Sequence, residues 1–170
     1  MTQGFSRTIH EANDFVSSYG TFLVAPFNAK IITIRGPKEI DNTTKDLEWG
    51  CGVLMTSTED PTYRVCYWHC LPVFPVREGD YVLQGDVVAQ MGNTGWVESN
   101  GKLVPLDLRL IPPYIGTHVH ISMGIGDGTA ENTENVDYSS YIDWTIPVKY
   151  DLLTAIRAII INMANIIKGR

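Results

Sequence analysis

Short runs of apolar, β-branched and aromatic residues, separated by turn residues, recur along the chain before residue 126. Residues of these types favour extended backbone, in which successive side chains point to opposite faces. Turn formers such as Gly36-Pro37, Gly79-Asp80 and Asn100-Gly101 separate the runs. Many short strands predict a mainly β fold, an antiparallel β-sandwich or barrel. The runs expected to form strands are residues 22–24, 30–34, 52–56, 63–70, 81–83, 87–90 and 119–123.

A helical period replaces this pattern at the C-terminal end of the chain. From Tyr150 to Lys168, leucine and isoleucine recur at helical intervals with polar residues between them. The spacing predicts an amphipathic α-helix over residues 150–170. Its charges and amides make it a poor membrane span. We expect it to pack on its own domain; the alternative is a contact in a homo-oligomer, or attachment to a virion or a larger protein.

Residues 1–149 are expected to form one domain. The chain has 170 residues, of which 44% are hydrophobic, and this is enough for one core. Residues 96–117 contain Pro105, Pro112 and Pro113 and are interpreted as a long insertion. Ordered loops of this length often shape a substrate cleft.

The charge of the chain narrows the choice of partners. A net charge of −6 and a pI near 5.1, with no cluster of lysine or arginine, argue against nucleic acid. Residues 1–7 are polar and do not form the apolar, cationic leader of a signal peptide.

The cysteines are Cys51, Cys66 and Cys70, an odd number, so they cannot all pair within one chain. Cys66 and Cys70 flank His69, so a zinc site made of cysteine and histidine is an alternative interpretation. Their spacing is not the usual Cys-x-x-Cys, and on a strand both would lie on the face opposite His69. Buried free thiols are therefore the favoured interpretation.

All four histidines stand in contexts typical of a metal site. His118 and His120 are two residues apart, so on a strand they share a face. His10 and Asp14 are four residues apart, a spacing that brings them together on a helix and on one side of an extended segment. His69 is the fourth histidine. Hydrolytic zinc takes about three histidine or carboxylate ligands and keeps a position for water, so the remaining histidines could transfer protons.

Five segments of the chain, in this order, carry a resemblance to a known family. They resemble segments of the lysostaphin-type, LytM-like zinc metallopeptidases, and the order and rough spacing agree across residues 4–126. The segments are His10 to Phe15 with its His-x-x-x-Asp motif, Gly20 to Pro26, Tyr67-Trp68-His69, residues 76–95 with the Gly-Asp-x-Val-x-x-Gly pattern, and His118-Val119-His120.

The resemblance implies a fold, a metal and a reaction. It implies a LytM-like domain that binds one Zn²⁺ through His10, Asp14 and His120, with His69 and His118 beside the attacked carbonyl as proton-transferring or oxyanion-stabilising groups. The implied activity is an endopeptidase that cuts a peptide bond in the stem peptides or cross-bridges of peptidoglycan. The chain departs from the family pattern at Ala12, at Cys70 and in the long stretch before His118.

Three aromatic residues are candidates for the substrate groove: Tyr67, Trp96 and Tyr114. Tyr67 is included because on a strand it shares a face with His69. Trp68 and Met91 are most simply core residues.

Other functions remain as alternatives. A catalytically inactive LytM-like module that binds wall or a partner is the main one. A biotinyl or lipoyl carrier would need a modifiable lysine at a tight turn, and residues 90–95 contain none. A sugar phosphocarrier would not need the pair of His10 and Asp14. Since an enzyme of the cell wall must reach it, the chain is expected to be a domain of a larger secreted protein or a phage or prophage product, virion-associated or released at lysis.

Overall fold

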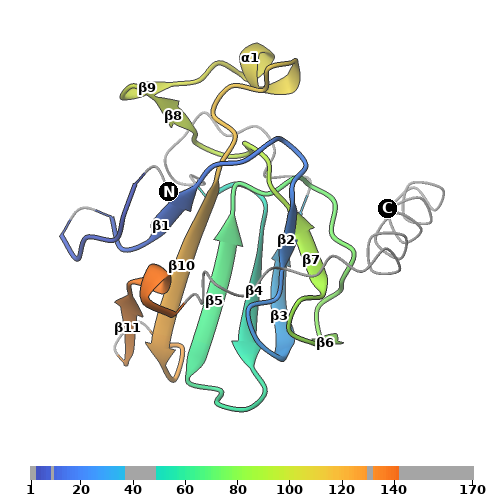
Figure 1. Ribbon diagram of the computed structural model, residues 1–170, viewed down its shortest axis with the longest axis vertical. Helices are drawn as coiled ribbons and strands as arrows, with labels where there is room; N and C mark the ends of the chain where they lie inside the picture. Colours follow the sequence, from blue (N-terminus) through green and yellow to red (C-terminus); the bar gives the residue numbers. More distant parts are fainter. Residues whose placement is uncertain (1–2, 9, 37–48, 130–131, 142–170) are drawn as a thin grey trace.

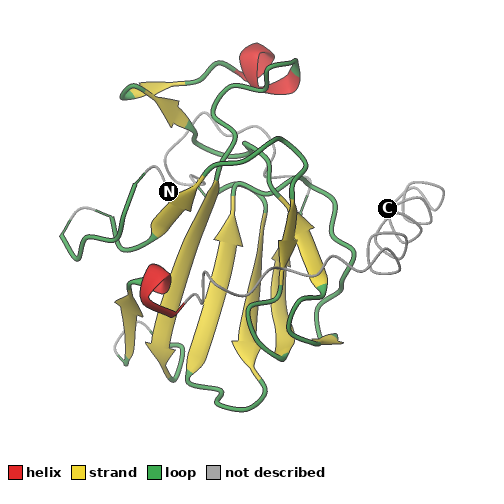
Figure 2. Ribbon diagram, in the orientation of Figure 1, coloured by secondary structure: helices red, strands yellow, loops and turns green. Residues whose placement is uncertain are grey.

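A computed structural model describes residues 3–8, 10–36, 49–129 and 132–141 (Figure 1). Strands account for most of the regular structure in these residues, as Figure 2 shows. All seven expected runs form strands, so the prediction of a mainly β, antiparallel fold is confirmed. The helix expected over residues 150–170 lies outside the described residues. Among those described, no helix is long and apolar enough to cross a membrane.

Within the described residues, a seven-stranded antiparallel sheet forms the larger layer. Its strands follow the order β1-β10-β5-β4-β3-β6, and β11 pairs with β10 beyond the end of β1. The strands are β1 (Asn13–Phe15), β3 (Ala29–Arg35), β4 (Gly52–Ser57), β5 (Tyr63–Trp68), β6 (Tyr81–Val82), β10 (Val119–Gly126) and β11 (Thr133–Val136). β10 lies between β1 and β5, so it brings together segments from opposite ends of the chain.

The smaller layer is the antiparallel pair of β2 (Phe22–Val24) and β7 (Val87–Gln90). The core lies between the two layers. One face of the large sheet supplies alternate residues to it, including Val53, Met55, Val65, Tyr67, Val119 and Ile121, and β7 supplies Val88 and Ala89. Because side chains alternate along a strand, the side chains between these core residues in β4, β5 and β10 lie on the opposite face of the sheet, away from the core.

A β-bulge changes the alternation in β3. Ile31 pairs with Met55 and Thr33 pairs with Leu54, so Ile32 is an extra residue in the ladder. Ile31 is fully buried in the core, and without the bulge Arg35 would lie on the same face. The extra residue reverses the faces, which is a known effect of bulges, and places Arg35 on the face away from the core.

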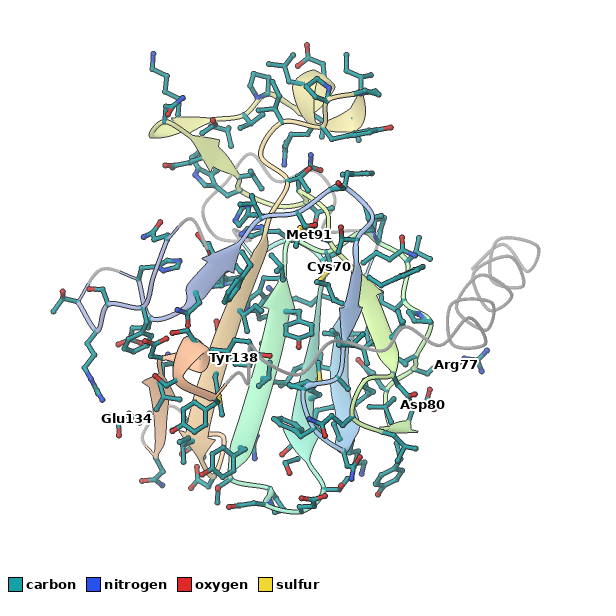
Figure 3. The ribbon with its side chains drawn as sticks, viewed as in Figure 1. Cys70, Arg77, Asp80, Met91, Glu134 and Tyr138 are labelled. Carbon is teal, nitrogen blue, oxygen red and sulfur yellow. The ribbon has the colours of Figure 1, made fainter. Side chains whose placement is uncertain are left out.

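The two layers join at the end of the sheet where β5 ends and β10 begins. Cys70 and Met91, labelled in Figure 3, form an antiparallel bridge between the segments that follow β5 and β7. A second bridge joins Gly92 to His118 just before β10. These two bridges fix the backbone next to His69 and His118 at this end of the sheets.

The insertion at residues 96–117 projects beyond this end of the sheets (Figure 1). It contains the hairpin of β8 (Glu98–Ser99) and β9 (Lys102–Leu103) and the short helix α1 (Leu106–Leu110). The sequence predicted a loop here, and these elements were not anticipated. The 3-10 helix η3 (Tyr138–Tyr141) follows β11 and packs near β10.

Candidate metal centre

His10, Asp14 and His120 meet where β1 pairs with β10. Asp14 lies directly opposite His120 in the antiparallel register, and the bend at residues 11–12 brings His10 to the same place. The Oδ1 atom of Asp14 is 3.4 Å from Nε2 of His10 and 3.1 Å from Nδ1 of His120. The two imidazole nitrogens are 3.2 Å apart. Three ligand atoms of the types that zinc prefers thus form a nearly equilateral triangle.

The size of this triangle fits one zinc ion. Tetrahedral zinc bonds nitrogen and oxygen at about 2.0–2.1 Å, which puts neighbouring ligand atoms about 3.3 Å from one another. The three separations, 3.1, 3.2 and 3.4 Å, agree with that edge. The Nδ1 atom of His10 is 3.3 Å from the carbonyl oxygen of Gly4, which can only accept a hydrogen bond. This contact favours a proton on Nδ1 and leaves the lone pair of Nε2 for a metal.

His69 and His118 lie beside this triangle. Their ring centroids are 4.6 Å apart, and the rings of His69 and His120 are 6.0 Å apart. Nδ1–H of His69 donates to the carbonyl oxygen of Thr94 at 2.7 Å, and Nδ1–H of His118 donates to that of Gly116 at 2.8 Å. Because a carbonyl only accepts, Nδ1 carries a proton in each ring, so in the neutral imidazole it is Nε2 that keeps the lone pair.

Burial and neighbouring groups set the charge states of His69 and Asp14. Burial is the main reason that the pKa of His69 falls to about 3, with the neighbouring His118 adding to the effect, so His69 is neutral at ordinary pH. Burial alone would raise the pKa of Asp14, but the hydrogen bond from His120 and the charges of the nearby histidines outweigh it and lower that pKa. Asp14 is therefore a carboxylate, the form that binds metal.

The neutral state of His69 predicts a pH dependence of stability. In the unfolded chain its pKa returns to the ordinary value of 6.5, so below that pH the unfolded chain binds a proton that the folded chain takes up only near pH 3. The free energy of unfolding of the wild type must then fall as the pH falls from 6.5. In urea unfolding with a chelator present, we expect His69→Gln to lose less stability than the wild type between pH 6.5 and about pH 4. The pKa of Asp14 lies below its ordinary 3.8, outside this window. Parallel losses in the two proteins would contradict the assignment.

A cleft of about 860 Å³ runs from this cluster across the outer face of the large sheet. Its floor consists of the side chains that alternate with the core residues of β3, β4, β5 and β10. The described residues that line it are Gln3, His10, Glu11, Asp14, Thr33, Arg35, Trp49, Gly52, Leu54, Cys66, Trp68, His69, Trp96, Glu98, His118, His120, Ser122 and Asn135.

The expected groove residues divide into three cases. Trp96 lines the cleft, and its Nε1–H donates to Glu98 at 2.8 Å. Tyr67 does not line the cleft: it is buried in the core, and its hydroxyl donates to the carbonyl oxygen of Val24. The expectation that Tyr67 and His69 share a strand face is wrong. His69 has a φ of 58°, so the alternation of side chains along β5 ends before it. Tyr114 stacks on Tyr19, with ring centroids 4.1 Å apart, and neither lines the cleft.

Two aromatic residues of the cleft were not expected from the sequence. The expectation that Trp68 is a core residue is wrong, since it lines the cleft from β5. Trp49 also lines the cleft, and its ring lies 5.0 Å from the ring of His120 and 5.8 Å from that of Trp68. The alternation of β5 carried a signal for Trp68, because it is one residue from the core position Tyr67. No comparable signal marks Trp49, which precedes its strand.

A buried arginine holds the insertion against the site. Arg109 in α1 is 2% exposed, and its Nη1 donates to the carbonyl oxygens of Asn93 and Gly95. The side chain of Asn93 in turn donates to the carbonyl oxygens of Arg109 and Ile115. Thr94 lies between the two residues that Arg109 binds, and its carbonyl is the acceptor for His69. The insertion is thereby connected to the position of His69.

All three cysteines are buried, and none forms a disulfide. This agrees with the favoured interpretation of free thiols. Burial raises the pKa of the thiols of Cys66 and Cys70, which keeps them protonated. Among the described residues, the ligand atoms that lie close enough together to hold one metal ion are those of His10, Asp14 and His120, and this group contains no cysteine, so a zinc site of cysteine and histidine around His69 is disfavoured.

Comparison with known proteins places the chain among peptidases. The sequence model of Peptidase family M23 matches residues 8–133, about three quarters of the chain. No curated protein matches. Three similar solved structures show the same fold. They are the catalytic domain of the antimicrobial peptidase lysostaphin from Staphylococcus simulans (21% identity, TM-score 0.51, covering 74% of this chain and 74% of that chain), LytU (23%, 0.53, 78% and 75%), and a variant of the catalytic domain of the prophage-encoded M23 protein EnpA from Enterococcus faecalis (17%, 0.52, 84% and 86%).

Proposed function

Because the chain belongs to Peptidase family M23, we propose that it is a zinc-dependent endopeptidase that hydrolyses a peptide bond in the stem peptides or cross-bridges of peptidoglycan. The observation that carries this proposal is the triangle of His10, Asp14 and His120, whose three edges fit one tetrahedral zinc ion. The site of action is then the bacterial cell wall.

His10, Asp14 and His120 would hold the metal, which when bound activates a water molecule and polarises the scissile carbonyl. His69 and His118 would act on that water. Each presents a lone pair on Nε2, so each can accept a hydrogen bond from the water and orient it. Since burial keeps His69 neutral, its Nε2 would act by accepting a hydrogen bond that orients the water rather than by holding a proton.

The cleft supplies the surface for the peptide. Trp49, Trp68 and Trp96 line it, and flat aromatic faces pack well against extended peptide backbone. A catalytically inactive binding module, the main alternative, would not require three ligand atoms at zinc spacing or two neighbouring imidazoles that carry lone pairs.

Metal analysis combined with a wall assay tests the proposal. Protein purified without added zinc should carry about one zinc per chain and should clear a suspension of bacterial cell walls. A chelator should stop the clearing, and added zinc should restore it. Mass spectrometry of the soluble products should show a new amino terminus, which separates peptide hydrolysis from cleavage of the sugar chain. Protein that binds zinc and sediments with the walls, yet releases no product, would contradict an enzyme and favour the binding module.

A further inference from the structure

One row of residues crosses the large sheet from the metal centre to its far side. Asp14 pairs with His120, His120 pairs with Trp68, and Arg35 pairs with Gly52. Trp68 and Gly52 adjoin: a Cβ on Gly52 would lie 2.4 Å from Cε3 of the Trp68 ring. All five residues line the cleft. The absence of a side chain at Gly52 lets the indole lie over the strand, so the row has a flat apolar floor with ligands at one end and a cation at the other.

Arg35 is the only lysine or arginine among the described residues that line the cleft. Its guanidinium carbon lies 5.5 Å from the centre of the Trp68 ring. A cation–π contact of this kind holds the guanidinium over the ring but leaves its N–H groups available, and their planar fork matches a carboxylate. No carboxylate of the described residues forms an ion pair with Arg35. By contrast, Arg7 pairs with Glu134, and Arg64 donates to a backbone carbonyl.

The bulge in β3 is what brings Arg35 into the cleft. Ile31, on the other side of the bulge, is in the core, so a regular strand would turn Arg35 inward. Three strand spacings separate His120 on β10 from Arg35 on β3, and at about 4.8 Å each this is about 14 Å. An extended peptide rises about 3.4 Å per residue, so it covers this distance in about four residues.

We propose that Arg35 binds a carboxylate of the peptide substrate about four residues from the bond that is cut, so that the protein prefers stem peptides with free carboxyl groups to amidated ones. The inference rests on the proposed function and adds a determinant of specificity to it. The carboxylate is held by paired hydrogen bonds from the guanidinium edge while the intervening residues cross the cleft between Arg35 and the metal centre.

Two synthetic stem pentapeptides that differ only in their carboxyl groups, free in one and amidated in the other, provide the test. Binding is measured by calorimetry on the full chain after zinc chelation, and kcat/KM is measured on the zinc-loaded protein. The wild type should bind the free peptide about tenfold more tightly than the amidated one, the size of one charge-assisted hydrogen-bonded pair that is partly open to water. Arg35→Gln should reduce this ratio of affinities to about one by weakening the binding of the free peptide, with affinity for the amidated peptide unchanged. In the kinetic measurement the same loss should appear as a higher KM for the free peptide.

Lys30→Gln is the matched control. Lys30 is on the same strand and lies over an aromatic ring, that of Tyr81, but outside the cleft. Lys30→Gln should keep the wild-type ratio of affinities for the two peptides. Arg35→Lys should keep only part of this ratio, because an ammonium lacks the planar fork of a guanidinium. If Arg35 merely supported Trp68, Arg35→Gln would weaken both peptides equally, which would overturn the proposal.

The remaining outcomes separate this inference from the proposed function. Equal affinity of the wild type for the two peptides, or no binding of either at millimolar concentration, overturns the carboxylate site even if walls are cleared. A tenfold preference in the binding measurement, without hydrolysis of any substrate, retains the site and removes the endopeptidase.

Discussion

Replacing His120 with alanine is expected to abolish stoichiometric zinc binding and to reduce the clearing of cell walls by more than about 100-fold, the upper range for losing a residue that merely orients a ligand. His120 supplies one corner of the ligand triangle, 3.1 Å from Asp14 and 3.2 Å from His10. A catalytic zinc site has three protein ligands and one water, and His120→Ala leaves only two of the three. Alanine has no ligand atom to replace the imidazole at this position, which is 8% exposed. Zinc content is measured by elemental analysis after dialysis, and clearing by turbidity.

His118→Ala is the control for this experiment. His118 is two residues from His120, but it is not part of the triangle, and its Nδ1–H is taken by Gly116. This variant should therefore keep its zinc while losing about 10²- to 10⁴-fold in rate, the usual contribution of a positioned acid or base. Zinc retained at full stoichiometry by His120→Ala, or lost from His118→Ala, would show that the ligands are assigned wrongly.

Replacing Arg109 with methionine is expected to lower the free energy of unfolding by about 2–4 kcal/mol, because the carbonyl oxygens of Asn93 and Gly95 lose their buried donor. Arg109 is 2% exposed, so water cannot take the place of the guanidinium without opening the insertion. The same turn carries the carbonyl of Thr94 that orients His69. The rate of wall clearing should fall as well. Stability is measured by urea unfolding at neutral pH.

Lys102→Met is the matched control, since Lys102 lies in the same insertion on β9 and is exposed. It removes a cation of similar length and should change stability by less than about 0.5 kcal/mol. If Arg109→Met were as stable as Lys102→Met, the buried hydrogen bonds of Arg109 would contribute no net stability, and the insertion would be held in some other way.

Much of the fold follows from local pattern alone. The seven runs of β-forming residues were expected in the positions where strands occur, because alternation and turn chemistry act over only a few residues. The pairs His10 with Asp14 and His118 with His120 were recognisable for the same reason. The proposal that His10, Asp14 and His120 bind one metal came from resemblance, and the register of β1 against β10 now supplies a geometry that supports it.

The errors occur where one residue alters a local rule. Tyr67 was expected beside His69 in the groove, but a positive φ at His69 ends the alternation, so Tyr67 is buried and Trp68 lines the cleft. Arg35 was not considered at all, because the bulge at Ile32 reverses the faces of β3 and leaves no mark in the sequence. In the sequence Arg109 is an ordinary polar residue of a loop. Only the folded structure shows that it is buried against the turn at Asn93.

The sequence by itself determined seven of the described strands, but not β1, β8, β9 or β11. It also determined which residue types could bind zinc and which broad chemistry they suit, since these depend on side-chain identity and on the two-residue period of extended backbone. Only the tertiary structure decided which residues meet. Antiparallel register places Asp14 opposite His120, backbone carbonyls select the protonated nitrogen of His69 and His118, and a single bulge places Arg35 in the cleft. These outcomes depend on pairing between segments up to about a hundred residues apart in the chain, where no local pattern carries the information.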